Sequence, residues 1–239
     1  MALHWIRGLV FTVVIYTLMA VYAVAFAPFA IYDRAYAFAA CRFYCRSVRW
    51  LARWMVGIET EVRGTPPTDE VMIAAKHQSF LDIMLIFGAI PRGKFIMKKE
   101  LTYTPFIGQY ALRLGCVPVD RGKRGAAIAK MLDDVKKDAD AAGQLIIYPQ
   151  GTRVPPGESK PYKAGTGALY RQLGQTCVPV ATNVGHFWPR RGIIKRPGLA
   201  IVEFLEPIEP GLEVAEFMAL LEERVETASD RLTSETTGN

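Results

Sequence analysis

The sequence lacks the patterns on which metal enzymes and covalent hydrolases depend. Its four cysteines form no CxxC pair, and its three histidines are too dispersed for a zinc site. It has no Gly-x-Ser-x-Gly segment, the turn that presents a nucleophilic serine in many hydrolases. We therefore expect no metal and no covalent enzyme intermediate, and we expect a reduced, cytosolic environment for the thiols.

The chain also lacks internal repeats and low-complexity linkers. Its 239 residues are enough for one domain of ordinary size with a short appendage, so we expect one active site. Hydrophobic residues make up 51% of the chain, and mean hydropathy is +0.14. This excess is concentrated near the N-terminus and indicates contact with lipid.

The N-terminal region has no charge over 25 consecutive residues, from Gly8 to Tyr32. A run of this length is sufficient to cross the hydrocarbon core of a bilayer. It is too long for the apolar part of a signal peptide, and no small-residue cleavage site follows it. The sequence predicts a membrane segment, which Pro28 interrupts.

A second segment, residues 35–58, carries arginines spaced three or four apart among aromatic residues: Arg42, Arg46, Arg49 and Arg53. This spacing places them on one face of a helix. Such a helix either lies in the headgroup layer and binds anionic lipid, or packs beneath a single anchor as part of the soluble domain. Residues 1–60 are accordingly predicted to be a membrane-anchoring helical segment.

Positive charge predominates outside the C-terminal region. The formal charge is +6, but residues 206–239 contain nine acidic and two basic residues, which leaves about +13 on the rest of the chain. A basic surface suits a phospholipid membrane, a phosphorylated substrate or nucleic acid. No nucleic-acid recognition motif is present, and the basic residues lie among lipid-like segments, which argues against nucleic acid.

Residues 61–239 alternate between short β-rich runs and helical stretches, as is typical of an α/β domain. The predicted strands are 71–76, 94–98, 115–119, 144–148, 178–183 and 199–205. The predicted helices are 79–89, 105–114, 126–142, 163–173 and 212–232. In the last of these, Val214, Phe217, Leu221, Val225 and Leu232 form a core-facing stripe.

The sharpest local feature is the segment from His77 to Asp82, which follows a predicted strand. Ser79 is a plausible helix N-cap, which would put Asp82 in the first helical turn. A carboxylate there can fold back onto the imidazole and leave its second nitrogen free to take a proton from a hydroxyl. Alternatively, Asp82 merely favours a helix N-terminus and His77 is a structural strand-end residue.

Three further segments complete a pattern. After His77 and Asp82 come GCVPVDR at 115–121, YPQGTR at 148–153 and VPVA at 178–181. In order and spacing these four blocks resemble the glycerolipid acyltransferase family, and in particular the 1-acylglycerol-3-phosphate acyltransferases. The resemblance covers residues 71–207 and implies a mixed sheet flanked by helices.

The resemblance implies transfer of a fatty acyl group from acyl-CoA or acyl carrier protein to the free hydroxyl of a lysophosphatidic acid, which yields phosphatidic acid. His77 would be the general base and Asp82 would orient it. No cofactor would be needed. The partners would be the bilayer and the two substrates, and the enzyme would work at the cytosolic face of the cell inner membrane.

The third block is expected to bind the acceptor. We predict that Arg153 grips its phosphate through two hydrogen bonds and that Gly151 lets the backbone approach the ligand, with Thr152 beside them. Gln150 stands where the family has glutamate, so it keeps an acceptor but loses the charge. This departure leaves open another acceptor, such as a lyso-ornithine lipid or a lysophospholipid with a larger headgroup, or a non-catalytic lipid-binding homologue.

Other basic residues resemble family positions that face phosphate. One of Lys98 and Lys99 is expected to do so, as are Arg121, which closes the second block, and Lys163, which leads into a helix. The basic glycine turn at 122–125 is a further candidate for a phosphate of the acyl carrier. Residues 102–114 either line a tunnel for the acyl chain or form an ordinary core helix.

Overall fold

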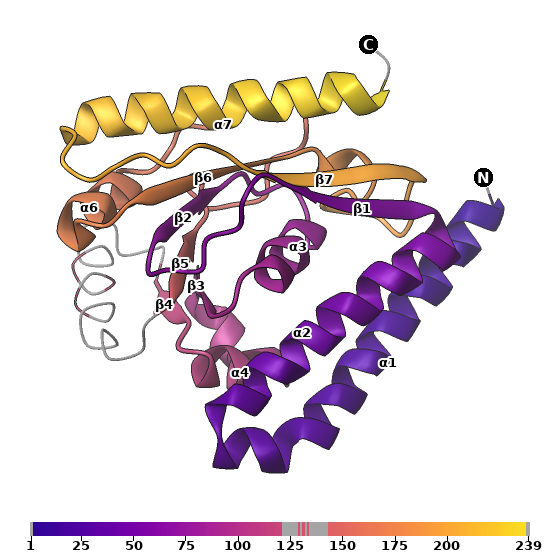
Figure 1. Ribbon diagram of the computed structural model, residues 1–239. Coiled ribbons are helices and arrows are strands. Elements are labelled where there is room, and N and C mark those ends of the chain that lie inside the picture. The colour runs from indigo at the N-terminus through magenta and orange to yellow at the C-terminus, as the bar shows by residue number, and fades with distance from the viewer. Residues whose placement is uncertain (1, 121–128, 130, 132, 134–142, 238–239) are drawn as a thin grey trace.

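Seven strands form one sheet with helices on both faces in the computed structural model, which describes residues 2–120, 129, 131, 133 and 143–237 (Figure 1). The strand order is β1-β7-β6-β2-β5-β3-β4. Neighbouring strands are parallel except β6 and β7, which are antiparallel, so the sheet is mixed as expected. Because β2, β5 and β6 are parallel neighbours, the loops after them meet at one edge of the sheet, where α/β proteins commonly bind ligands.

The strands are β1 (Ile58–Arg63), β2 (Met72–Ala75), β3 (Gly93–Lys98), β4 (Val117–Val119), β5 (Gln144–Ile147), β6 (Cys177–Thr182) and β7 (Gly198–Phe204). The α-helices are α1 (Ala2–Tyr32), α2 (Arg34–Leu51), α3 (Leu81–Ala89), α4 (Ile107–Arg113), α6 (Ala164–Leu173) and α7 (Val214–Thr237). Shorter helical segments are the π-helix η1 (Ala52–Val56) and the 3-10 helices η2 (Lys99–Tyr103) and η4 (Val184–His186).

All six predicted strands are present, but β1 was missed. Residues 35–58 were expected to be helical throughout, but the helical structure ends at Val56 and β1 starts at Ile58. Its sequence, IETEVR, places glutamates at alternate positions, so the hydrophobic signal of an edge strand is weak. The predicted helix at 126–142 lies largely outside the described residues.

Alternate residues along the central strands face two separate cores. In β2, Ile73 and Ala75 pack with α3 and the α1–α2 hairpin, whereas Met72 and Ala74 pack with α6 and α7. The predicted stripe on α7 is confirmed, since Phe217, Leu221, Val225 and Leu232 are completely buried. Continuing this alternation past Ala75 directs Lys76 toward α7 and His77 toward the opposite face.

The N-terminal helices form a hairpin along the face opposite α7 (Figure 1). By length and composition α1 could cross a membrane, and it runs unbroken through Pro28. It turns at Asp33, whose side chain accepts a hydrogen bond of 2.8 Å from the Ala35 amide. Near its other end, a Cβ on Gly8 would lie 2.3 Å from the Ile193 carbonyl oxygen, so glycine permits the close approach to the sheet domain.

The predicted arginine face of α2 divides between two environments. Arg42 and Arg46 are exposed, whereas Arg49 donates a hydrogen bond of 2.9 Å to the Thr60 hydroxyl of β1. The helix itself packs against α1, α3 and α4. The N-terminal hairpin and the sheet domain are therefore joined by a continuous core.

Candidate active site

The loop after β2 brings His77 and Asp82 together. The Nδ1 atom of His77 lies 2.8 Å from Oδ1 of Asp82. The second carboxylate oxygen accepts backbone hydrogen bonds of 2.8 Å from Gln78 and 2.7 Å from Ser79. Asp82 is fully buried, and the His77 side chain is 14% exposed. This carboxylate is held by several donors, so it can fix the orientation of the imidazole.

The predicted cap at Ser79 is wrong by one residue. The N-cap position of α3 is Phe80, whose side chain makes no capping hydrogen bond. Ser79 Oγ accepts a hydrogen bond of 3.2 Å from the Leu81 amide, and Asp82 takes the preceding amides. The Asp82 carboxylate thus holds the loop before α3 and orients the histidine at the same time.

Tyr148 completes this cluster and was not identified from the sequence. Its ring stacks on the His77 imidazole with centroids 4.0 Å apart, and its hydroxyl donates to Oδ1 of Asp82 at 3.3 Å. Burial, reinforced by the Asp82 charge, raises the pKa of Tyr148 well above 10. The phenol therefore remains a hydrogen-bond donor throughout the neutral range.

The turn after β5 joins the same site through its backbone. The Gly151 amide donates to the Tyr148 carbonyl at 2.8 Å, with a φ of +68° that favours glycine. Two residues beyond the glycine comes Arg153, whose neighbour Val154 donates its amide to the His77 carbonyl at 2.8 Å. This bond places Arg153 next to the His77 loop. Arg153 and Thr152 are both partly buried.

Lys163 adjoins this turn. Its amide donates to the Pro149 carbonyl at 2.9 Å, and a Cβ on Gly151 would lie 2.7 Å from its Cε atom. Gln150 is buried, and its Nε2 lies 3.5 Å from the Lys160 carbonyl and 3.4 Å from a Glu226 carboxylate oxygen. Gln150 thus points toward α7, on the other face from His77.

The other predicted phosphate contacts are not drawn into this cluster by any contact in the described part of the chain. Lys98 Nζ lies 3.1 Å from Glu100 Oε1 at the surface, and Lys99 is exposed at the start of η2. Arg121 and the turn at 122–125 lie outside the described residues. Nor do the described residues contain a group of three or more His, Cys, Asp or Glu side chains able to hold a metal ion.

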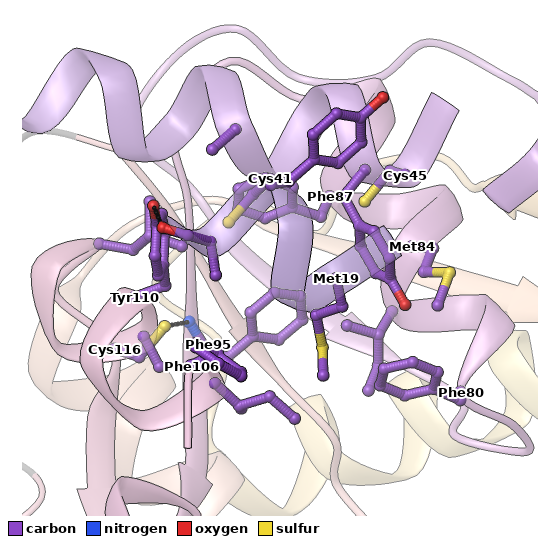
Figure 2. Close-up of a pocket in the computed structure, with 18 residues that line it drawn as sticks. Met19, Cys41, Cys45, Phe80, Met84, Phe87, Phe95, Phe106, Tyr110 and Cys116 are labelled. Carbon is purple, nitrogen blue, oxygen red and sulfur yellow. Dashed lines mark hydrogen bonds between the residues drawn. The ribbon is translucent and has the colours of Figure 1, made fainter. Parts of the chain in front are cut away.

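An apolar cavity of about 190 Å³ lies between the N-terminal hairpin, α3, β3 and α4 (Figure 2). Phe106, Ile107, Tyr110 and Leu114 of the predicted tunnel segment line it, whereas Tyr103 does not and is 76% exposed. The remaining lining residues are Met19, Tyr22, Ala23, Ala40, Cys41, Tyr44, Cys45, Phe80, Ile83, Met84, Phe87, Phe95, Ala111 and Cys116.

Two aromatic residues connect this cavity with the polar cluster. Phe80, which lines the cavity, belongs to the loop that carries His77 and Asp82. Phe95 also lines the cavity and stacks against Tyr148 with centroids 6.2 Å apart. A long apolar ligand in the cavity would therefore have one end near His77.

Comparison with known proteins gives consistent matches. The sequence pattern of the acyltransferase family matches residues 59–183. A 1-acyl-sn-glycerol-3-phosphate acyltransferase of Pseudomonas aeruginosa is 32% identical over 157 residues, which cover 65% of this chain and 61% of that protein. One from Saccharomyces cerevisiae is 35% identical over 164 residues, covering 64% of this chain and 53% of that protein. The matched part is thus less than two thirds of either relative.

The fold has a counterpart among solved structures. The crystal structure of a 1-acyl-sn-glycerophosphate acyltransferase from Thermotoga maritima superposes with a TM-score of 0.79. The superposition covers 97% of this chain and 98% of that chain, at 24% sequence identity. The similarity therefore includes the N-terminal helical hairpin as well as the sheet.

Proposed function

The chain belongs to the acyltransferase family, and on that premise we propose that it acylates 1-acyl-glycerol-3-phosphate to give phosphatidic acid. The acyl group would come from the thioester of acyl-CoA or acyl carrier protein. The observation that carries this proposal is the 2.8 Å contact between His77 Nδ1 and buried Asp82. The names of the relatives from Pseudomonas and yeast support the choice of acceptor.

His77 would act as general base through Nε2. The Asp82 contact favours a proton on Nδ1, so Nε2 carries the lone pair and can accept the proton of the acceptor hydroxyl. Asp82 then stabilises the imidazolium that forms, without taking the proton itself. Burial of Asp82 strengthens this electrostatic effect because little water screens it.

The hydroxyl oxygen would attack the thioester carbonyl carbon directly. A carbon–oxygen bond forms while the carbonyl electrons move to oxygen, and their return expels the thiolate. The imidazolium returns its proton to that thiolate, so His77 ends the cycle neutral. A thioester is already activated, so a positioned base and a correctly placed acceptor provide most of the required catalysis.

Arg153 would hold the phosphate of the acceptor. The backbone bond from Val154 to His77 keeps the arginine beside the general base, and the guanidinium makes no ion pair with another described residue. A guanidinium can bind a phosphate through two parallel hydrogen bonds. Lys163, which packs over Gly151, would add a second positive charge.

The apolar cavity would hold an acyl chain of one of the two substrates. Its lining is hydrophobic, and Phe80 and Phe95 link it to the catalytic cluster. The exposed apolar surface of α1 supports attachment to a membrane, from which the acceptor would enter. We propose the cytosolic face of the cell inner membrane, where a thioester donor from the cytosol could reach the site.

The direct test is acyl transfer by the purified protein from acyl-CoA and, separately, from acyl carrier protein to a panel of lyso-lipids. Transfer to lysophosphatidic acid that disappears in folded His77→Ala is the expected result. Transfer that requires His77 but uses only another lyso-lipid, such as lyso-ornithine lipid, would retain the mechanism and refute the acceptor. No transfer to any lyso-lipid by the folded wild type would refute the enzymatic function.

A further inference from the structure

A second polar cluster lies beneath the catalytic loops, on the face of the sheet covered by α7. Lys76, which is 4% exposed, pairs with Oε2 of Glu226. The other oxygen of Glu226 accepts a hydrogen bond of 2.9 Å from the Tyr162 hydroxyl and lies 3.4 Å from Gln150 Nε2. Glu226 therefore connects the residue before His77, the segment before α6 and the turn that carries Arg153.

The amide nitrogen of Gln150 has acceptors around it, whereas its buried Oε1 atom has no hydrogen-bond partner among the described residues. Its Nε2 faces two acceptors, the Lys160 carbonyl oxygen and the Glu226 carboxylate. A glutamate at this position would place a second carboxylate about where the amide nitrogen now approaches Glu226, with position 150 itself 3% exposed and the Glu226 side chain 23% exposed. Two carboxylates at such a distance cannot both remain ionised without a large electrostatic cost. The neutral amide of Gln150 can thus donate to the Glu226 carboxylate on α7, which a second carboxylate at this position could not do while ionised.

We infer that Glu226 is a positioning residue for the active site, acting through Gln150 on the Arg153 turn and through Lys76 on the His77 loop. This inference rests on the proposed function, and it explains the glutamine in the third block. The acidic group of this cluster is supplied by the C-terminal helix, so the turn must provide the amide. Gln150 and Glu226 form one functional pair.

The test is a double-mutant cycle of wild type, Gln150→Glu, Glu226→Gln and the double variant. Acyl transfer to lysophosphatidic acid and unfolding temperature are measured for each. Glu223→Gln is the matched control, because Glu223 is an exposed glutamate on the same helix. We expect each single substitution to lower kcat/KM at least about 10-fold, whereas the double variant regains most of the loss because it restores one carboxylate and one amide.

The expected loss is mainly a higher KM for the acceptor, because the pair supports the turn that carries Arg153. A purely structural contact would lower the unfolding temperature and leave this KM unchanged. If the loss of kcat/KM in the double variant equals the product of the two single losses, the residues act independently and the inference is overturned. Activity of Gln150→Glu equal to that of wild type would overturn it as well. Glu226→Gln introduces no charge and keeps the side-chain shape, so it remains informative if Gln150→Glu does not fold.

The pH dependence of stability provides a readout without substrate. The groups around position 150 are Lys76 from the end of β2, Tyr162 before α6, and Glu226 and Glu222 from α7. In Gln150→Glu two carboxylates would share the single positive charge of Lys76, and protonation of one of them relieves their repulsion, so the stability deficit should be larger at pH 8 than at pH 5. If the wild type is inactive but the substitutions at positions 150 and 226 still affect each other's stability, only the proposed function is refuted. If the wild type is active and the two substitutions act independently, only the pairing of Gln150 with Glu226 is refuted.

Discussion

The ring of Tyr148 stacks on the imidazole of His77 with centroids 4.0 Å apart and planes inclined by 21°. This contact fixes one face of the imidazole. The Tyr148 hydroxyl also donates to Oδ1 of Asp82, the same oxygen that lies beside Nδ1 of His77.

Tyr148→Phe keeps the stack and removes only a 3.3 Å hydrogen bond, so we expect a loss in kcat of less than about 10-fold. Tyr148→Ala also removes the stacked ring, so its kcat should fall considerably further. Steady-state kinetics of the folded variants would measure this, and equal losses of kcat in the two variants would refute orientation of His77 by stacking.

Asp82→Asn is predicted to reduce kcat by a factor on the order of 10² to 10⁴, because the amide no longer stabilises the imidazolium. The same substitution weakens the bonds from the Gln78 and Ser79 amides, so circular dichroism must establish that the variant is folded. Asp230→Asn, at an exposed position on α7, is the control for removal of a carboxylate. Retention of wild-type kcat by Asp82→Asn would contradict general-base catalysis by His77.

Arg153→Ala is predicted to raise the KM for the lyso-lipid phosphate by about 10-fold or more, with a smaller change in the KM for the thioester. Arg153→Lys should recover part of the loss, since lysine keeps the charge but not the two-pronged geometry. Arg191→Ala removes an exposed arginine and serves as the control. If Arg191→Ala raises the KM for the lyso-lipid as much as Arg153→Ala does, the effect comes from general surface charge and not from a phosphate contact of Arg153.

Ala111→Phe should shift the preferred acyl chain toward shorter lengths. Ala111 lines the apolar cavity, so a phenyl group there occupies space that a long chain needs. The adjacent Leu112 is 53% exposed and does not line the cavity, so Leu112→Phe should retain the wild-type preference. Competition between thioesters and between lyso-lipids of different lengths would show which substrate places its chain in the cavity.

Lys195 should make stability depend on pH. It is 5% exposed, and burial lowers its pKa from 10.5 to about 8. The unfolded chain therefore binds more protons between pH 8 and 10.5, so this residue makes the folded state relatively more stable as pH rises through that window. Unfolding temperatures of wild type and Lys195→Met, compared at pH 7.5 and 9.5, should reveal the difference; parallel curves would contradict it.

Much of the sheet could be predicted because the central strands are short apolar runs bounded by polar turns. The pairing of His77 with Asp82 was also predictable, because five positions separate a strand end from the first turn of a helix. By contrast, β1 carries alternating glutamates and lies at an edge, so its hydrophobic signal is weak. Sequence alone also misplaced the cap of α3 by one residue, because Asp82 holds the amides of Gln78 and Ser79 in the preceding loop and the helix begins only at Leu81.

The parts of the site that were missed depend on contacts between distant segments. Tyr148 lies 66 residues beyond Asp82, and Glu226 lies 150 residues beyond Lys76. No local pattern indicates that Glu226 is different from the other glutamates of α7. The motif shows that Gln150 is unusual, but why a glutamine stands there is suggested only by the Glu226 carboxylate that faces its amide.

The pairing of β1 with β7 has a consequence for biogenesis. These strands align from Ile58 with Gly198 to Arg63 with Glu203, so the edge next to the N-terminal hairpin is completed by residues translated much later. During synthesis the apolar helix α1 leaves the ribosome well before β7 exists. If α1 enters lipid as it emerges, its insertion can therefore precede closure of the sheet, and the edge strand would pair with β7 on a chain that is already attached to the bilayer.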